Sequence, residues 1–245
     1  MTSRLVDGDL QTALLAALGT VRDPELDESI VDLGFVTEAT TADGHAHVRL
    51  RLPTYFCAPN FAYLMVADAH DAALSVPQID TVSVVLEEHF AAEEINSGVA
   101  AELGFVRSFP GEAGADLTEL RANFQRKAHL AAMERACARL LRDGWTIDML
   151  PKARLADLPD GAERRSLLRR RADVGLPLRE EALVFVDDAG VAVRPEDAPI
   201  RLRFARTVRV SIDGNAHFCR GLLVTRYPES AATQRPRPFT EEGPR

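Results

Sequence analysis

The residues that follow Asp43-Gly44 constrain the fold more than any other part of the sequence. From position 45 to position 52, polar and apolar side chains alternate without interruption, which is typical of a strand that buries one face. The apolar residues on that face are Ala46, Val48, Leu50 and Leu52. Because Asp-Gly is a common two-residue turn between antiparallel strands, the pattern predicts a hairpin whose second strand ends at Pro53.

The segments on either side of the hairpin predict a small α+β unit. Apolar residues with helical spacing favour a helix near residues 10–18, and Pro59 favours the start of a second helix that runs to about Leu74. Two short apolar runs, residues 30–35 and 79–86, are typical of buried strands. The order helix, two hairpin strands, helix and strand predicts a single layer of sheet with helices packed on it.

The remaining sequence predicts a helical segment followed by a β-rich region. Asp116 and Glu119 have the spacing of a capping box, and they open a long helix that is expected to end near Gly144. Further along, Asp213-Gly214 is interpreted as a hairpin turn between two strands, residues 200–212 and 216–227.

Four parts are therefore expected along the chain. They are an α+β domain over residues 1–104, a helical segment over 105–175, a β-rich region over 176–228 and a disordered tail over 229–245. The tail is rich in proline, polar and charged residues, and such a composition does not bury a core.

The composition favours an ordinary globular protein and disfavours several other classes. The formal net charge of −8 over 245 residues argues against nucleic acid as a partner. There is no apolar run of membrane-spanning length and the first ten residues are too polar for a secretory signal, so we expect a cytoplasmic protein with no membrane partner. Three widely spaced cysteines argue against a disulfide framework and against a cysteine-rich metal site within one chain.

Cys57 is the cysteine in the most suggestive setting. It precedes Pro59 by two residues, close to the predicted start of a helix, where unpaired amides and the helix dipole favour a thiolate. Asp23, Glu25 and Thr54 are expected nearby if the acidic loop and the end of the hairpin strand meet at one edge of the sheet. The alternative is that Cys57 is a small buried apolar residue.

Two motifs make the first part of the chain resemble a known family. Asp23-Pro24-Glu25-Leu26 is followed by Ser29-Ile30-Val31-Asp32-Leu33-Gly34, and a Thr-to-Pro segment comes after the hairpin. Over about residues 10–88 the sequence is similar to the small α+β iron–sulfur cluster assembly proteins, a family of metal–sulfur cluster biosynthesis that includes the SufT-like and PaaD-like maturation factors. The resemblance implies the fold of that family and a function in maturing iron-containing centres.

The resemblance also implies which residues form the site. Asp23, Glu25 and Thr54 match the family's clustered polar positions. Family members usually have a cysteine directly before the proline, whereas here Ala58 takes that position and Cys57 precedes it by one residue. The implied cofactor-binding set is therefore Cys57, Asp23, Glu25 and Thr54, with iron or an iron–sulfur cluster held only transiently.

His89 and Glu93 suggest a different chemistry. They are four residues apart, so on a helix they share one face, and with loop carboxylates they have the ligand types of a metal site. The alternative is a solvated helix face whose acidic residues lie favourably near the helix N-terminus. The pair supports the rival hypothesis of a metal-binding protein or enzyme.

Taken together, the sequence predicts a non-catalytic accessory factor, a metallochaperone or maturation factor. We expect it to assist the assembly or insertion of an iron–sulfur or di-iron centre in a client metalloprotein, with the β-rich region as the client-binding part. Family analogy suggests an oxygenase component as the client. A purely structural protein-interaction module is the third hypothesis, and self-association into a homo-oligomer is left open.

Overall fold

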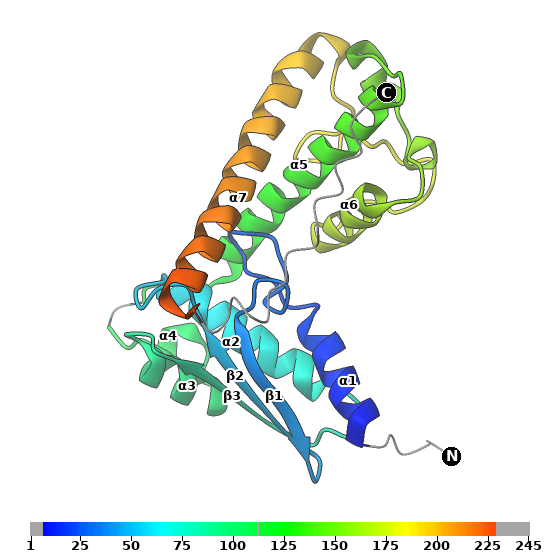
Figure 1. Ribbon diagram of the computed structural model, residues 1–245. Helices are drawn as coiled ribbons and strands as arrows, with labels where there is room; N and C mark the ends of the chain where they lie inside the picture. The colour runs from blue at the N-terminus through cyan, green and yellow to red at the C-terminus, as the bar shows by residue number, and fades with distance from the viewer. Residues whose placement is uncertain (1–6, 112, 229–245) are drawn as a thin grey trace. The chain divides into compact units, whose positions relative to one another are not determined.

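The computed structural model describes residues 7–111 and 113–228, which form two compact units (Figure 1). Within the described residues, unit 1 is drawn from the stretches 7–23, 28–114 and 217–228, and unit 2 from 24–27 and 115–216. The predicted disordered tail, residues 229–245, lies outside the described residues. In the described part of the chain, no helix is both long enough and apolar enough to cross a membrane.

Unit 1 is built on a three-stranded sheet with the order β1-β2-β3. The strands β1 (Val36–Ala42) and β2 (His45–Arg51) are antiparallel and form the hairpin predicted from Asp43-Gly44. The two turn residues have φ of 49° and 77°, as a two-residue hairpin turn requires. β3 (Thr81–Glu87) pairs with β2 in parallel, and the helix α2 (Pro59–Leu74) makes the crossover between them.

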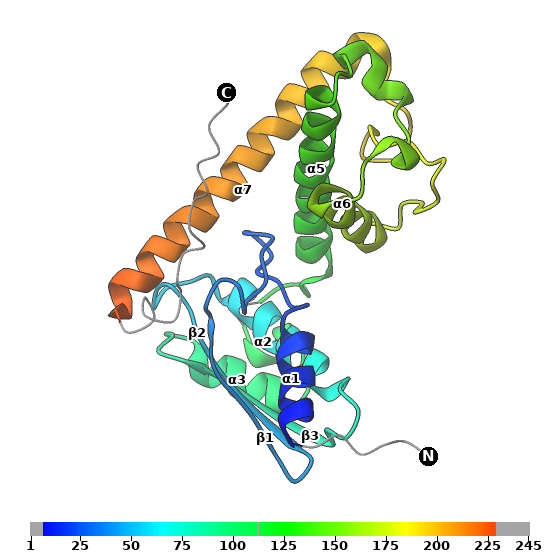
Figure 2. The same cartoon turned by 45° about the vertical axis from the view of Figure 1, so that its right-hand side comes forward.

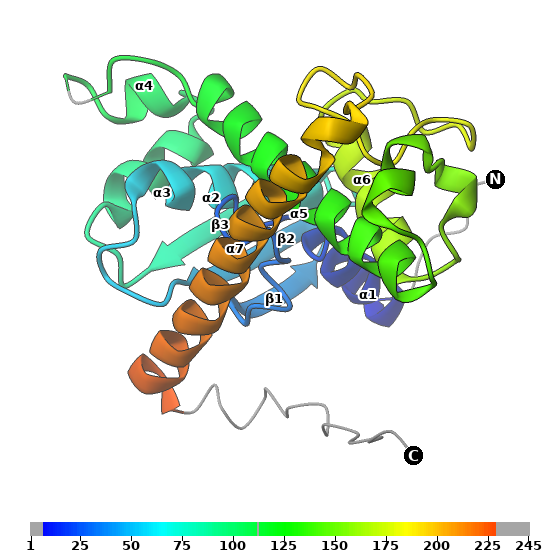
Figure 3. The same cartoon turned by 90° about the horizontal axis from the view of Figure 1, so that it is seen from above.

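Helices pack on this sheet and bury one of its faces. The β2 residues that the sequence places on the inner face, Ala46, Val48 and Leu50, are at most 1% exposed. The helix α1 (Asp7–Leu18) contacts β1, while α2 and α3 (Ala92–Ala100) contact β3; Figure 3 shows α2 and α3 beside that strand. A short helix, α4 (Phe105–Ser108), follows α3. The predicted α+β class is confirmed.

The apolar run at residues 30–35 is buried as predicted, but it is not a strand. Ile30 and Leu33 are completely buried, yet residues 31–34 form turns and the first strand begins only at Val36. The backbone turns here because the Gly34 N–H donates to the Val31 carbonyl and Gly34 adopts a φ of 76°. A short apolar run gives the same periodicity for a buried turn as for a buried strand, so the sequence pattern did not separate the two.

Unit 2 is helical. Its helices α5 (Thr118–Arg142) and α6 (Ala162–Asp173) pack against each other, as Figure 2 shows. α5 begins at Thr118, close to the predicted start, but the predicted capping box does not form: the N-cap residue is Leu117, without a side-chain cap, and the Asp116 carboxylate accepts a 2.9 Å hydrogen bond from the Thr118 N–H just before the helix. Three short 3-10 helices also belong to the unit: η1 (Ile147–Lys152), η2 (Leu155–Asp157) and η3 (Pro195–Asp197). The large apolar residues of its core that are completely buried are Met133, Leu140, Leu150, Leu155, Leu167 and Phe185.

The predicted C-terminal β-rich region is wrong, because α7 (Ala198–Arg226) is one long helix that contains almost all of both expected strands. Its buried residues recur at helical intervals: Ala198, Ala205, Ile212, Ala216 and Leu223. Asp213, interpreted as a hairpin turn, instead accepts a 2.7 Å hydrogen bond from Arg209 one turn earlier in the helix. Between α6 and α7, the described residues form isolated β-bridges, at Leu183 and at Val186, and no strand.

The hairpin turn supplies a first prediction. Gly44→Ala should lower the free energy of unfolding by about 1–2 kcal/mol, because a residue with a side chain is strained at positive φ. In addition, the new Cβ would lie 2.8 Å from Asp80 Oδ2. Chemical denaturation followed by circular dichroism measures the change. Gly221→Ala is the matched control, since Gly221 lies in α7 with open space around it, and there we expect no loss or a gain of up to about 1 kcal/mol. Equal losses at both sites would contradict this account of the turn.

A second prediction concerns the pH dependence of stability, and it rests on His129. It is 5% exposed on α5, and its Nε2 has no hydrogen-bond partner within the described residues. Burial lowers the pKa of His129 to about 4, the charges of Arg171 and Arg201 act in the same direction, and Asp188 opposes them. The unfolded chain therefore takes up this proton near pH 6.5, well before the folded protein does.

The stability that depends on neutral His129 is therefore complete above pH 6.5 and is lost as the pH falls toward 4. The shift corresponds to a contribution on the order of 3 kcal/mol. Denaturation curves across this range should show a shallower pH dependence in His129→Leu than in the wild type. The exposed His217 provides the control substitution, His217→Leu. An unchanged pH dependence in His129→Leu would rule out this histidine as the cause.

Candidate functional site

The candidate site lies where two neighbouring parallel strands end. In the register of the sheet, Arg51 at the end of β2 lies opposite Glu87 at the end of β3. The loops that follow, residues 52–58 and 88–91, therefore leave the same edge of the sheet, which is where ligand sites form in sheets with parallel strands. The two loops are joined directly, since the Phe90 N–H donates a 3.1 Å hydrogen bond to the Tyr55 carbonyl. We call this edge the loop rim.

Thr54 and Cys57 meet at the loop rim. Thr54 Oγ1 lies 3.3 Å from Cys57 Sγ, within hydrogen-bonding distance for sulfur. The Phe56 N–H donates to the same hydroxyl oxygen at 3.2 Å, which fixes the Thr54 side chain, and either the hydroxyl or the thiol can be the donor between Thr54 and Cys57. Cys57 is partly exposed, and α2 begins two residues later at Pro59. The thiol is therefore accessible from solvent and is not enclosed in the core.

His89 holds the Cys57 segment from the inside. Its side chain is buried, and Nε2 lies 2.7 Å from the Cys57 carbonyl oxygen. Nδ1 accepts a 3.2 Å hydrogen bond from the Ala91 N–H, so Nδ1 carries the lone pair and Nε2 carries the hydrogen that is donated to Cys57. Burial lowers the pKa of His89, while the hydrogen bond to Cys57 opposes the shift and the charge of Arg226 adds to it. The imidazole is therefore neutral, and both of its nitrogens form hydrogen bonds, which hold the Cys57 segment against the loop 88–91.

This arrangement bears on the predicted metal pair. With both ring nitrogens in hydrogen bonds, His89 has no lone pair left for a metal ion. Glu93 lies exposed in the first turn of α3. Within the described residues, no three side chains of His, Cys, Asp or Glu gather in a way that could hold a metal. The metal-binding role of His89 and Glu93 stays a prediction, without support from this geometry.

Three exposed aromatic side chains lie on the two loops of the rim. Tyr55, Phe56 and Phe90 are 45%, 78% and 48% exposed. They form one group, in which the Phe56 ring centroid is 5.0 Å from that of Tyr55 and 6.1 Å from that of Phe90. Large exposed aromatic residues in one place are unusual for a free protein surface and typical of surfaces that bind another protein. The adjacent pair Tyr55-Phe56, directly before Cys57, was the available sequence signal for this aromatic cluster.

The last residue of α7 and the residue after it hold the two loops of the rim together, and both belong to unit 1. Arg226 donates hydrogen bonds to the Leu52 carbonyl at 3.3 Å and to the Glu88 carbonyl at 2.8 Å, so it joins the two loops. The Tyr227 hydroxyl donates to Glu88 Oε2 at 2.8 Å, and the Arg51 guanidinium lies over the Tyr227 ring. Burial, reinforced by the hydrogen bond to Glu88, raises the pKa of Tyr227 to about 12, so this phenol remains a donor. These contacts span well over a hundred residues of sequence, which is why sequence reasoning missed them.

The predicted acidic loop is divided between the two units. Asp23 is 8% exposed in unit 1, and its N–H donates to the Glu28 carbonyl at 3.0 Å. Glu25 belongs to unit 2, where it accepts a 3.2 Å hydrogen bond from the Asn215 side chain. Of the four residues expected at the site, the structure therefore joins Thr54 and Cys57. The participation of Asp23 and Glu25 stays a prediction.

A third prediction concerns the two hydrogen bonds of His89. His89→Phe keeps a ring of similar size but removes both hydrogen bonds, and it should let the Cys57 segment open more often. We expect iodoacetamide to alkylate Cys57 about fivefold faster or more, as the loss of about 1 kcal/mol implies. Peptide mass spectrometry measures the rate, with the partly exposed Cys219 as an internal reference. His45→Phe, on the exposed side of β2, is the control, and equal rates in the two variants would show that His89 does not brace this segment.

The comparisons with known proteins give one family match, over part of the chain. Residues 11–85 match the family described as iron-sulfur cluster assembly protein. Neither the curated proteins nor the solved structures gave a match. The matched segment runs from α1 into β3, so it contains Thr54 and Cys57 and stops before His89. Over this segment, the resemblance to the iron–sulfur cluster assembly family is confirmed.

Proposed function

We propose that this protein assists the assembly or insertion of an iron–sulfur or di-iron centre in a client protein, and that the loop rim is its working surface. The observation that carries the proposal is the partly exposed Cys57 thiol beside the Thr54 hydroxyl, at the start of α2, inside a segment that matches iron–sulfur cluster assembly proteins. In this proposal the iron or cluster is cargo that is passed on to the client.

A single thiol fits a role in transfer better than one in storage. Iron–sulfur clusters are held by about four thiolate ligands, and Cys57 supplies one. The client's own ligands therefore have to provide the rest while the centre is handed over. Thr54 would orient the Cys57 sulfur, and the neutral His89 would fix the backbone that carries it. Asp23 and Glu25 are proposed as further members of this site on the strength of the family resemblance.

The aromatic cluster gives the client a place to bind. Tyr55, Phe56 and Phe90 lie on the same two loops as the thiol, so a protein that covers them brings its metal site close to Cys57. Aromatic residues at the centre of an interface often contribute most of its binding energy. An oxygenase component as the client is the finer part of the proposal, and it rests on the family resemblance.

A deletion strain of the native host provides the test, which is our fourth prediction. The strain is complemented with the wild type, Cys57→Ser, Phe56→Ser or Cys219→Ser, and proteins that co-purify with the wild type are then isolated from each strain. We expect their iron and acid-labile sulfide content and activity to fall several-fold in Cys57→Ser and Phe56→Ser. Cys219→Ser, which changes the other partly exposed thiol, should behave as the wild type.

The two variants separate the two parts of the proposal. Phe56→Ser should lose co-purification of the client, because truncation of a central aromatic anchor costs about 2 kcal/mol or more. Cys57→Ser should still co-purify with the client yet leave it short of iron. A client with full iron content and activity in the Cys57→Ser strain would refute the transfer role. It would leave the loop rim as a structural interaction surface, which was the third hypothesis.

A further inference from the structure

Unit 2 has a groove of its own, outside the segment that matches the assembly family. It lies between α5 and the first half of α7, and has a volume of about 600 Å³, within the range of small-molecule sites. The helices are connected there by the ion pair between Arg209 and Glu134. The apolar residues of its wall are Ala138, Leu141, Ile147, Pro199 and Leu202.

The charged residues of the groove are mostly arginines, and two of them are not neutralised. Arg209 is paired with Glu134 and Asp213, and Arg142 lies 3.4 Å from a carboxylate oxygen of α6. Arg203 and Arg206 are exposed and have no ion pair or side-chain hydrogen bond with any described residue. Since they are three residues apart in α7, they lie on the same side of the helix. The groove therefore presents two available guanidinium groups next to an apolar wall.

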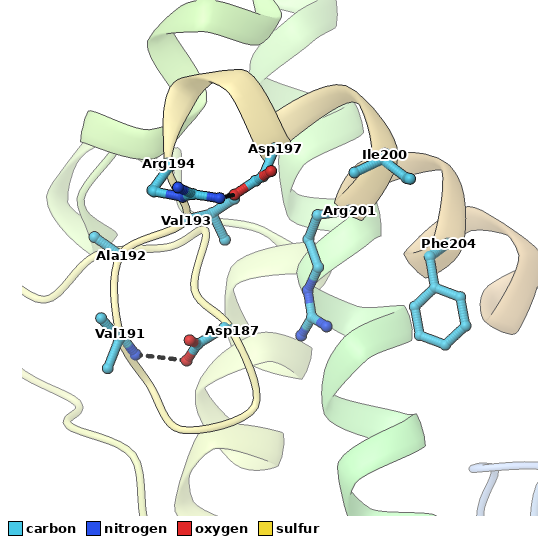
Figure 4. Close-up of a pocket in the computed structure, with 9 residues that line it drawn as sticks. All are labelled: Asp187, Val191, Ala192, Val193, Arg194, Asp197, Ile200, Arg201 and Phe204. Atoms are coloured by element: carbon cyan, nitrogen blue, oxygen red, sulfur yellow. Dashed lines mark hydrogen bonds and ion pairs between the residues drawn. The ribbon is translucent and has the colours of Figure 1, made fainter.

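A second hollow in unit 2 shows the contrast. It has a volume of about 480 Å³ and lies between the loop 187–194 and α7 (Figure 4). Both of its arginines are in ion pairs, since Arg194 pairs with Asp197 at 2.6 Å and Arg201 pairs with Asp188 at 2.5 Å. The charges of its two arginines are therefore compensated, and its remaining charged side chain is the Asp187 carboxylate, so it offers an anion less than the groove between α5 and α7 does.

We propose that the groove between α5 and α7 binds an amphipathic organic anion. Its carboxylate or phosphate head would bind Arg203 and Arg206, since guanidinium groups match both kinds of anion with paired hydrogen bonds. Its short hydrocarbon body would pack on Leu141, Ile147 and Leu202. A pocket that is largely apolar with a few convergent charged groups is the usual form of a small-molecule site. This site is independent of the loop rim and of the proposed maturation role.

Calorimetric titration of the full chain with octanoate and with octyl phosphate tests the proposal. We expect at least one of them to bind saturably, with the preferred head group showing whether a carboxylate or a phosphate is recognised. Inorganic phosphate, which lacks the hydrocarbon body, and octyl glucoside, which lacks the charge, should each bind about tenfold more weakly or worse. Affinity should fall with rising salt, because the guanidinium groups are exposed.

Substitutions assign the binding to this groove. Arg203→Ala and Arg206→Ala should each weaken octyl phosphate or octanoate binding about tenfold or more. Arg165→Ala and Arg169→Ala remove the same charge from exposed positions of α6 outside the groove, and they should leave binding unchanged. Ile147→Ser, at the partly exposed apolar wall, should weaken the octyl ligands while leaving inorganic phosphate unaffected. Circular dichroism and the melting temperature establish that each variant is folded.

Several results would overturn the proposal. Failure of both octyl ligands to saturate the protein would do so, as would equal binding by the wild type and the Arg203→Ala and Arg206→Ala variants. Inorganic phosphate that binds as tightly as octyl phosphate would indicate a simple anion site without a hydrocarbon pocket. Tighter binding of a short polyglutamate peptide would assign the groove to an acidic polypeptide instead.

Discussion

The parallel pairing of β2 and β3 is the constraint on which the candidate site depends. Parallel pairing requires a crossover connection between the strands, and α2 provides it. Because β2 and β3 end side by side, two loops that are about thirty residues apart in sequence leave the sheet at the same edge. The outer side of β3 is closed by Asn96 of α3, whose side-chain amide accepts from the Leu86 N–H at 2.8 Å and donates to the Leu86 carbonyl at 3.0 Å. That amide pairs the outward backbone groups of Leu86 as a neighbouring strand would, which covers the edge of β3 at this residue.

The loop rim is ordered by a neutral buried group, the His89 imidazole. A charged histidine would be costly at the buried position of His89, and the neutral ring instead satisfies one carbonyl and one amide that would otherwise be unpaired. Glu88, the residue before it, has a φ of 49°, an uncommon conformation for a residue with a side chain. Arg226 and Tyr227 hold the carbonyl and the carboxylate of Glu88. The loops are thus fixed before any partner arrives, which reduces the entropy that binding has to offset.

The elements that were predicted well are those with a local signal. Three such signals each act within a few residues: the Asp43-Gly44 turn, the alternation in β2 and the proline that opens α2. Residues 30–35 and α7 were predicted wrongly, because buried turns, strands and helices all accept short apolar runs. In α7 the β-branched and aromatic residues favoured strands, while packing at helical intervals and the Arg209–Asp213 pair stabilised a helix.

The candidate site, too, could be predicted from the sequence only in part. The proximity of Thr54 and Cys57 follows from their sequence spacing and the helix start at Pro59. The role of His89 depends on which strand pairs with β2 and in which direction, and a sequence pattern does not specify that. Arg226 and Tyr227 contact the loop rim only because α7 is a helix of the observed length. The sequence therefore identified the thiol, whereas the tertiary structure identified what supports it.

The short stretch 24–27 has a consequence for how this chain can be divided. Asp27 forms an ion pair with Arg170, and both side chains are less than a tenth exposed, so unit 2 takes one of its buried anions from a segment that precedes most of unit 1 in sequence. A fragment that begins at residue 115 would keep Arg170 but lose that anion, leaving only the more exposed Asp173 beside it. Arg170 would then depend on Asp173 alone, and unit 2 would lose a buried ion pair. No single cut therefore releases unit 2 intact, and a recombinant chimera or a gene fusion would have to transfer both pieces together.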